Sequence, residues 1–215
     1  VNMSGWIRWV VTGIFENIGM VQDGLQTIAQ PVSVTDREDA KPLQVARGEV
    51  RFEHVDFHYG KKRGIIGDLN LNIKPGEKIG LIGPSGAGKS TLVNLLLRLY
   101  DVEGGRILID GQNIADVGQE TLRAHIGMIT QDTSLLHRSI RDNLLYGKPD
   151  ATDAELWDAV HKARADEFIP LLSDAEGRTG FDAHVGERGV KLSGGQRQRI
   201  AIARVLLKDA PILIM

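Results

Sequence analysis

The chain has 215 residues, of which 42% are hydrophobic and 25% are charged, and its formal net charge is −2. These values describe one full globular domain with a sizeable core plus an attachment, and they exclude two large domains. The near-neutral charge gives no electrostatic basis for binding nucleic acid. The chain has no cysteine, which excludes disulfides, thiolate metal sites and cysteine nucleophiles. Its six histidines are scattered along the sequence, so no transition-metal site is predicted.

An apolar stretch with two tryptophans, Trp6 and Trp9, opens the chain over residues 4–15. An arginine interrupts it, it is shorter than the ~20 residues that span a bilayer, and it lacks the features of a signal peptide. Over residues 15–28 apolar side chains recur every three or four positions, which predicts one continuing amphipathic helix that ends near Pro31. Two interpretations remain: a soluble amphipathic helix, or the last part of a membrane helix.

A connector and two strands are predicted next. Residues 32–48 contain prolines and a mixed-charge run, which is typical of a connector. Residues 49–55 and 69–73 alternate polar and apolar side chains, which predicts half-buried strands. Between them, Tyr59 lies just before a basic turn at residues 61–63. Its ring could belong to the core or stack on a base, and spacing alone favours the core.

Residues 83–91 read Gly-Pro-Ser-Gly-Ala-Gly-Lys-Ser-Thr, which fits the phosphate-binding P-loop pattern. Residues 77–82 predict a short buried strand before it, and residues 92–99 an apolar helix after it. The glycines let backbone N–H groups converge on phosphate oxygens at the helix N-terminus. Lys89 would reach the β- and γ-phosphates, and the Ser90 hydroxyl would bind Mg²⁺. A Gly-rich turn that binds no ligand explains neither Lys89 nor Ser90. A dinucleotide-binding fingerprint is excluded, because it requires a glycine three residues after Gly88 and the chain has Thr91 there.

The segment beyond the P-loop predicts several short elements. They are a turn at Gly104–Gly105, a strand over residues 106–111, a short helix over 120–123, a strand over 126–130, and helices over 139–145 and 152–163, the last with a cap formed by Thr152 and Glu155. The strand over 126–130 delivers Gln131 to its carboxyl end, the edge at which open parallel sheets bind ligands. Gln131 could cap the strand or meet Mg²⁺ or an attacking water.

A second landmark is Leu-Ser-Gly-Gly-Gln-Arg-Gln-Arg at residues 192–199, which runs into an apolar helix over 200–207. Ser193 is a predicted N-cap, and the two glycines leave the helix start bare, so its N–H groups would form a second anion site. An ordinary capped helix explains the serine but not the paired glycines. Residues 212–215 then begin an apolar strand.

Together these motifs resemble the ATP-binding cassette (ABC) family, and their neighbouring residues resemble its exporter branch. The resemblance implies an α/β fold: a P-loop NTPase core sheet with an antiparallel β subdomain and a helical signature subdomain, preceded by an N-terminal helix. It implies that residues 1–30 are the C-terminal end of a transmembrane domain, 31–47 a linker, and 48–215 a nucleotide-binding domain that is incomplete at its C-terminal end.

The resemblance also implies roles for individual residues. Tyr59 would stack on adenine, Lys89 and Gln131 would be catalytic, and Ser90 and Gln131 would hold Mg²⁺. Ser193 and Gly195 would bind the γ-phosphate of ATP held by a second nucleotide-binding domain. The full set implied to bind ATP is Tyr59, Gly83, Pro84, Ser85, Gly86, Ala87, Gly88, Lys89, Ser90, Thr91, Gln131, Ser193, Gly194, Gly195 and Gln196. Residues 185–189 resemble the exporter loop that touches the intracellular loops of the transporter.

The implied function is ATP binding and hydrolysis that drives export through a head-to-tail dimer. The implied partners are a second nucleotide-binding domain, identical or different, and the transmembrane domain of the same transporter in the inner (plasma) membrane, with the nucleotide-binding domain on the cytoplasmic side. In the family the magnesium-binding Asp and catalytic Glu follow a strand like residues 212–215, and the chain stops before them, so we expect this chain alone to hydrolyse ATP very poorly. The alternatives are a soluble cassette ATPase of DNA repair or translation and a non-catalytic ATP-binding module.

Overall fold

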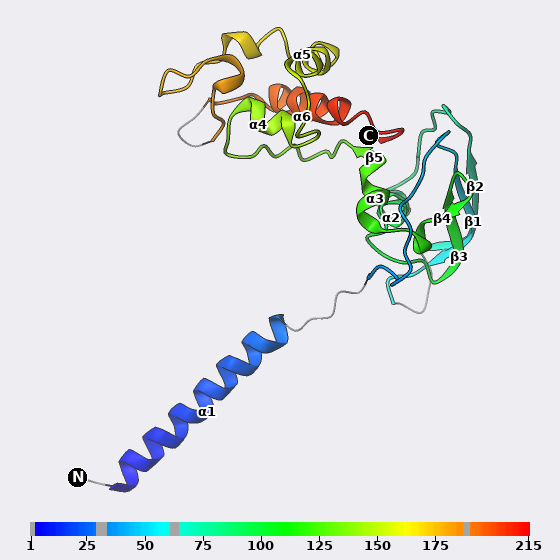
Figure 1. Cartoon of the computed structure of the whole chain (residues 1–215). Helices are drawn as coiled ribbons and strands as arrows, with labels where there is room; N and C mark the ends of the chain where they lie inside the picture. Colours follow the sequence, from blue (N-terminus) through cyan, green and yellow to red (C-terminus); the bar gives the residue numbers. More distant parts are fainter. Residues whose placement is uncertain (1–2, 29–33, 61–64, 187–189) are drawn as a thin grey trace. The chain divides into compact units, whose positions relative to one another are not determined.

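The computed structural model describes residues 3–28, 34–60, 65–186 and 190–215. The chain divides into two compact units, residues 1–35 and residues 36–215. In the first, helix α1 runs over Met3–Ile28 (Figure 1), which confirms the predicted continuous helix. Trp6 and Trp9 are exposed on it. None of the described helices is both long and apolar enough to cross a membrane. The predicted end near Pro31, the basic turn at 61–63 and residues 187–189 lie outside the described residues.

The second unit contains an antiparallel sheet with strand order β2-β1-β3-β4. The strands are β1 (Val50–Phe57), β2 (Ile66–Ile73), β3 (Gly104–Ile109) and β4 (Gln112–Asn113). The predicted alternation is confirmed in β1, where Val50 and Phe52 are buried. Leu95 from α2 (Lys89–Leu96) and Leu122 from α3 (Gln119–Ala124) complete the same hydrophobic core. The P-loop helix is therefore anchored by the core that the sheet forms.

The turn predicted at Gly104–Gly105 is wrong, because both glycines belong to β3. Gly104 pairs with Asp56 of β1, and the β1–β3 register shifts between Glu53 and Asp56. At this irregularity Gly105 adopts a φ of +72°, and a Cβ there would lie 2.2 Å from the carbonyl oxygen of His54. The glycines thus allow β3 to pass a bulge in β1, rather than to turn the chain.

The buried strand predicted over residues 77–82 is also wrong. The structure assigns no strand there, and Ile82 is 99% exposed. A buried parallel strand requires hydrogen-bonded neighbours, and among the described residues neither sheet includes this segment. The P-loop is therefore preceded by irregular, exposed backbone.

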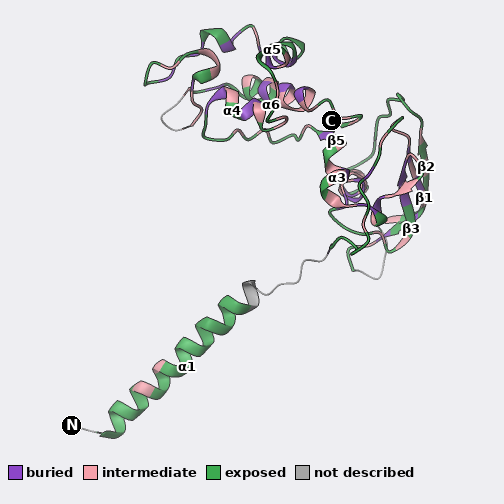
Figure 2. Ribbon diagram, viewed as in Figure 1, coloured by how far each residue is buried: buried purple, intermediate pink, exposed green. Residues whose placement is uncertain are grey.

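The remaining elements form a helical region with its own core. It contains α4 (Ile140–Leu145), α5 (Asp153–Lys162) and α6 (Gly194–Lys208), with the short 3₁₀ helices η2 (Ile169–Leu171) and η3 (Gly180–Asp182); η1 (Ile114–Asp116) follows β4. Buried residues of these helices belong to one hydrophobic core, and buried segments of α4, α5 and α6 are purple in Figure 2. The predicted helices are confirmed, as is the cap of α5, where Thr152 and Glu155 form a full capping box.

Two contacts determine where α6 lies. Arg204 donates to the backbone oxygen of Asn143 at 2.7 Å and to its side-chain oxygen at 2.9 Å, and Asn143 is fully buried. After α6, β6 (Ile212–Ile214) pairs in parallel with β5 (Ile126–Met128), which confirms both predicted strands. The helix that Ser193 caps is thus tied both to α4 and, through β6, to the strand before Gln131.

Asp110, at the end of β3, provides a test of the fold by pH. Its carboxylate accepts hydrogen bonds from the four successive backbone N–H groups of residues 46–49. Partial burial alone would raise its pKa, but these bonds outweigh it and lower the pKa from 3.8 to about 2. Because the pKa of Asp110 is lower in the folded state, its ionised carboxylate stabilises the fold at pH values above the unfolded pKa of 3.8. That contribution is lost as the pH falls toward 2.

We therefore expect Asp110→Asn to lower the free energy of unfolding by about 2 kcal/mol at neutral pH. Asparagine tolerates the left-handed backbone at this position, where φ is +46°, so backbone strain is not the cause. Urea unfolding at a series of pH values should show the two proteins converging between about pH 4 and pH 2. Parallel profiles over that range would contradict the assignment.

Candidate functional site

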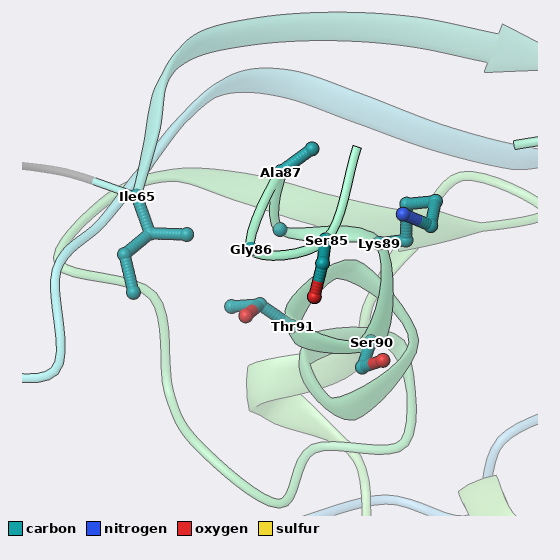
Figure 3. Close-up of a pocket in the computed structure, with 8 residues that line it drawn as sticks. Ile65, Ser85, Gly86, Ala87, Lys89, Ser90 and Thr91 are labelled. Carbon is teal, nitrogen blue, oxygen red and sulfur yellow. The ribbon is translucent and has the colours of Figure 1, made fainter. Parts of the chain in front are cut away.

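A pocket of about 270 Å³ lies over the start of α2. It is lined by Ile65, Ser85, Gly86, Ala87, Gly88, Lys89, Ser90 and Thr91. Seven of these residues belong to the predicted P-loop, and Ile65 faces them from the chain segment just before β2 (Figure 3). The loop runs into a helix, as predicted, and that helix begins at Lys89.

The two inner glycines of the loop give it its shape. Gly86 and Gly88 have φ values of +81° and +87°, in the left-handed region that favours glycine. Gly88 is the N-cap of α2, and a Cβ there would lie 3.2 Å from the Cγ2 of Ile65. Because the first N–H groups of a helix have no intrahelical acceptor, the first turn of α2 offers them to an anion in the pocket.

Lys89 turns back across its own loop. Its Nζ donates to the backbone oxygen of Gly83 at 2.8 Å and to that of Pro84 at 2.9 Å. The cation therefore lies at the loop that would hold phosphate, and a phosphate oxygen would replace these two carbonyls as its acceptor. Ser90 is exposed on the pocket wall, whereas Thr91 is buried.

Tyr59 lies beside this pocket. Its hydroxyl donates a long hydrogen bond, 3.4 Å, to Oγ1 of Thr91. The side chain is 38% exposed, so it is not a fully buried core residue. Sequence reasoning missed two neighbours, Ile65 and Tyr100. Neither belongs to a motif: Ile65 reaches the site because its N–H donates to the backbone oxygen of Phe57 at 2.8 Å, a contact set by the pairing of β1 with β2.

The other predicted site residues do not line this pocket. Gln131 is exposed shortly after β5. Ser193, the predicted N-cap, is confirmed: its hydroxyl accepts from the Gln196 N–H at 3.2 Å, and the Gln196 side chain accepts from the Ser193 N–H at 2.8 Å. Residues 193–196 thus form the N-terminus of α6, and they are not among the residues that line the P-loop pocket of the same chain.

The lining residues indicate what the pocket can do. It presents one lysine, the hydroxyl groups of Ser85, Ser90 and Thr91, and the first turn of a helix, all of which suit phosphate oxygens. The described residues that line it include no carboxylate and no histidine. Its own side chains therefore supply anion binding rather than a general base.

Comparison with known proteins agrees with this geometry. The family model described as ABC transporter matches residues 66–215. An uncharacterized ABC transporter ATP-binding protein of Haemophilus influenzae is 60% identical over 99% of the chain, and a putative multidrug export ATP-binding/permease protein of Bacillus subtilis is 45% identical over 95%. The chain spans about a third of the length of each, 35% and 34%.

A solved structure gives the same result for the fold. It is described as a bacterial Atm1-family ABC exporter with ATP bound, and it superposes with a TM-score of 0.81 at 42% identity. The match covers 93% of this chain and 34% of that one. A P-loop pocket of this shape, a family match over most of the chain and a shared fold all agree, and the chain belongs to the ABC transporter family.

Proposed function

We propose that this chain contains the nucleotide-binding domain of an ABC exporter, in which ATP binding and hydrolysis drive transport. The P-loop pocket with Lys89 at its loop carries the proposal. The name of the Bacillus subtilis relative describes a multidrug exporter with ATP-binding and permease parts, and the similar solved structure is an exporter with ATP bound. These names favour an exporter over a soluble cassette ATPase. Residues 1–30 would then be the end of the membrane domain, 31–47 the linker and 48–215 the nucleotide-binding domain, with that domain on the cytoplasmic side of the inner (plasma) membrane.

Mg²⁺ is the metal that the P-loop chemistry implies. The exposed hydroxyl of Ser90 on the pocket wall fits it, with nucleotide phosphates and water as the other oxygen ligands. When bound, Mg²⁺ neutralises charge on the β- and γ-phosphate oxygens. In the complete site, Gln131 would be a ligand of Mg²⁺ and would orient the attacking water. Lys89 would act with it in hydrolysis. Because Gln131 does not line the pocket, this step requires it to approach the loop.

Residues 193–196, at the N-terminus of α6, give a reason to expect dimerisation. Among the described residues, 193–196 do not line the P-loop pocket, which is consistent with their contacting a nucleotide held by another domain. We propose that Ser193 and Gly195 contact the γ-phosphate of ATP on a second nucleotide-binding domain, in a head-to-tail pair with two ATP molecules between the domains. The γ-phosphate would then hold both surfaces together, and its loss would release them.

Gly195→Glu tests this pairing without disturbing the fold. Nothing lies within 4 Å of a Cβ at Gly195, so a side chain fits there, but a carboxylate would repel the γ-phosphate. We expect the variant to bind MgATP like the unaltered chain and to lose the MgATP-dependent dimer in light scattering. Gln198→Glu adds the same charge at an exposed position of the same helix and should leave the dimer intact. Equal dimerisation of both variants would refute the role of Gly195.

A further inference from the structure

Three aromatic rings pack together at the edge of the pocket. The ring centroids of Phe57 and Tyr59 are 4.5 Å apart, those of Tyr59 and Tyr100 4.9 Å, and those of Phe57 and Tyr100 5.7 Å. Phe57 is buried with 3% exposure, whereas Tyr59 and Tyr100 are 38% and 40% exposed. Both tyrosines therefore rest on a buried ring and keep part of their surface open to solvent.

The backbone of Tyr59 is held in an unfavourable conformation. Its φ is +48°, in the left-handed region that side chains disfavour. Such a conformation persists where neighbours fix it, and here Glu103 holds the backbone just before Tyr59. The His58 N–H donates to Oε2 of Glu103 at 2.7 Å, and the Glu103 N–H donates to the backbone oxygen of Asp56 at 3.0 Å.

Tyr100 belongs to the same segment and is itself anchored. Arg98, only 3% exposed, donates to the backbone oxygen of Val117 at 2.8 Å and to Oδ1 of Asp101 at 3.0 Å. Tyr100 therefore lies between two residues joined by a hydrogen bond. With an interplanar angle of 87° between their rings, Tyr59 and Tyr100 meet edge to face, a favoured aromatic geometry. The Tyr59 ring is therefore in contact with both Tyr100 and the buried Phe57.

Tyr59 lies beside the part of the site that suits phosphate. The pocket is lined by residues 85–91 and Ile65, and its lysine, hydroxyl groups and helix start suit phosphate oxygens rather than a base. The Tyr59 hydroxyl is 3.4 Å from Oγ1 of Thr91 on the pocket wall, so the partly exposed Tyr59 ring is available to stack on the base of a nucleotide whose phosphates occupy the pocket.

We propose that Tyr100 is a positioning residue, which orients Tyr59 to stack on the base of the nucleotide. This inference rests on the proposed nucleotide binding at the P-loop. It separates two parts of the affinity: the phosphates are held by residues 85–91, and the base is held by a ring that depends on Tyr100. Removing Tyr100 therefore weakens binding of a nucleotide but not of a bare triphosphate.

The test compares MgATP with magnesium tripolyphosphate, which has no base, by calorimetric titration of the 215-residue chain. Tyr100→Leu is expected to weaken MgATP binding about tenfold, within the effect of losing one base–aromatic stack, and to leave tripolyphosphate binding unchanged. Tyr100→Phe retains the ring and should bind MgATP normally. Tyr59→Leu should give the same selective loss, and the double variant should lose no more than Tyr59→Leu alone, because both act through one ring.

Each outcome bears on the proposal. Equal weakening of both ligands by Tyr100→Leu would show a general structural role and overturn it, as would unaltered MgATP binding. Additive losses in the double variant would show that Tyr100 contacts the base without Tyr59, which also contradicts a positioning role. If the unaltered chain bound neither ligand, the proposed P-loop function would fail first, and this inference with it. If it bound both equally, only the base contact would fail.

Discussion

Lys89→Ala is expected to weaken MgATP binding at least about a hundredfold. The Nζ of Lys89 already donates two hydrogen bonds, to the backbone oxygens of Gly83 and Pro84, so its position allows two charge-assisted bonds to phosphate oxygens. Each such bond contributes about 1.5–3 kcal/mol, and losing both corresponds to at least two orders of magnitude in Kd. Calorimetric titration of the variant with MgATP measures this directly.

The lysine variant needs a control for charge and one for folding. Lys78 is exposed in the segment before the loop and does not line the pocket, so Lys78→Ala removes the same charge and should bind MgATP normally. Stability should be unaffected in Lys89→Ala, because the loop is exposed and water can satisfy the two freed carbonyls. Similar affinities for the two variants would mean that Lys89 does not hold the phosphates.

Gly105→Ala is expected to cause the largest loss of stability. A Cβ there would lie 2.2 Å from the backbone oxygen of His54 and 2.3 Å from that of Glu53, and φ is +72°. Backbone cannot yield as a flexible side chain can, so β1 must shift away from β3 and lose pairing. We expect the free energy of unfolding to fall by more than about 3 kcal/mol, which is at the large end for single substitutions.

Gly111→Ala separates the clash from the backbone strain. Gly111 has a similar φ of +79°, but nothing lies within 4 Å of its Cβ position. This variant should lose only about 1 kcal/mol, the cost of placing alanine in the left-handed region. Urea unfolding of both proteins gives the comparison. Equal losses would mean that the close approach of β1 to Gly105 does not constrain the fold.

Much of the site follows from local sequence. The P-loop pattern, the helix after it and the Ser193 N-cap each depend on residues within a few positions of one another, and all three are found. Gly104 and Gly105 could not be placed in the same way. Their conformation depends on a bulge in β1 about fifty residues earlier, and a glycine pair considered alone predicts a turn instead.

The parts that sequence reasoning missed depend on tertiary neighbours. Residues 79–82 are mostly apolar, and for that reason residues 77–82 predict a buried strand. Burial requires partner strands that no local pattern specifies, and none pairs with this segment among the described residues. Ile65 and Tyr100 belong to no motif. Sheet pairing brings Ile65 to the pocket, and the anchored segment after α2 brings Tyr100 to Tyr59.

The proposed function requires this chain to bind ATP through residues 85–91. Titration of the isotope-labelled chain with MgATP, followed by amide NMR shifts, tests it most directly. We predict saturable shifts that are largest at Gly86 and over residues 88–91, with smaller shifts at Tyr59 and Ile65. In Lys89→Ala the same shifts should require at least about a hundredfold more MgATP. Amide signals of residues 85–91 that stay unmoved at saturating MgATP would contradict the account.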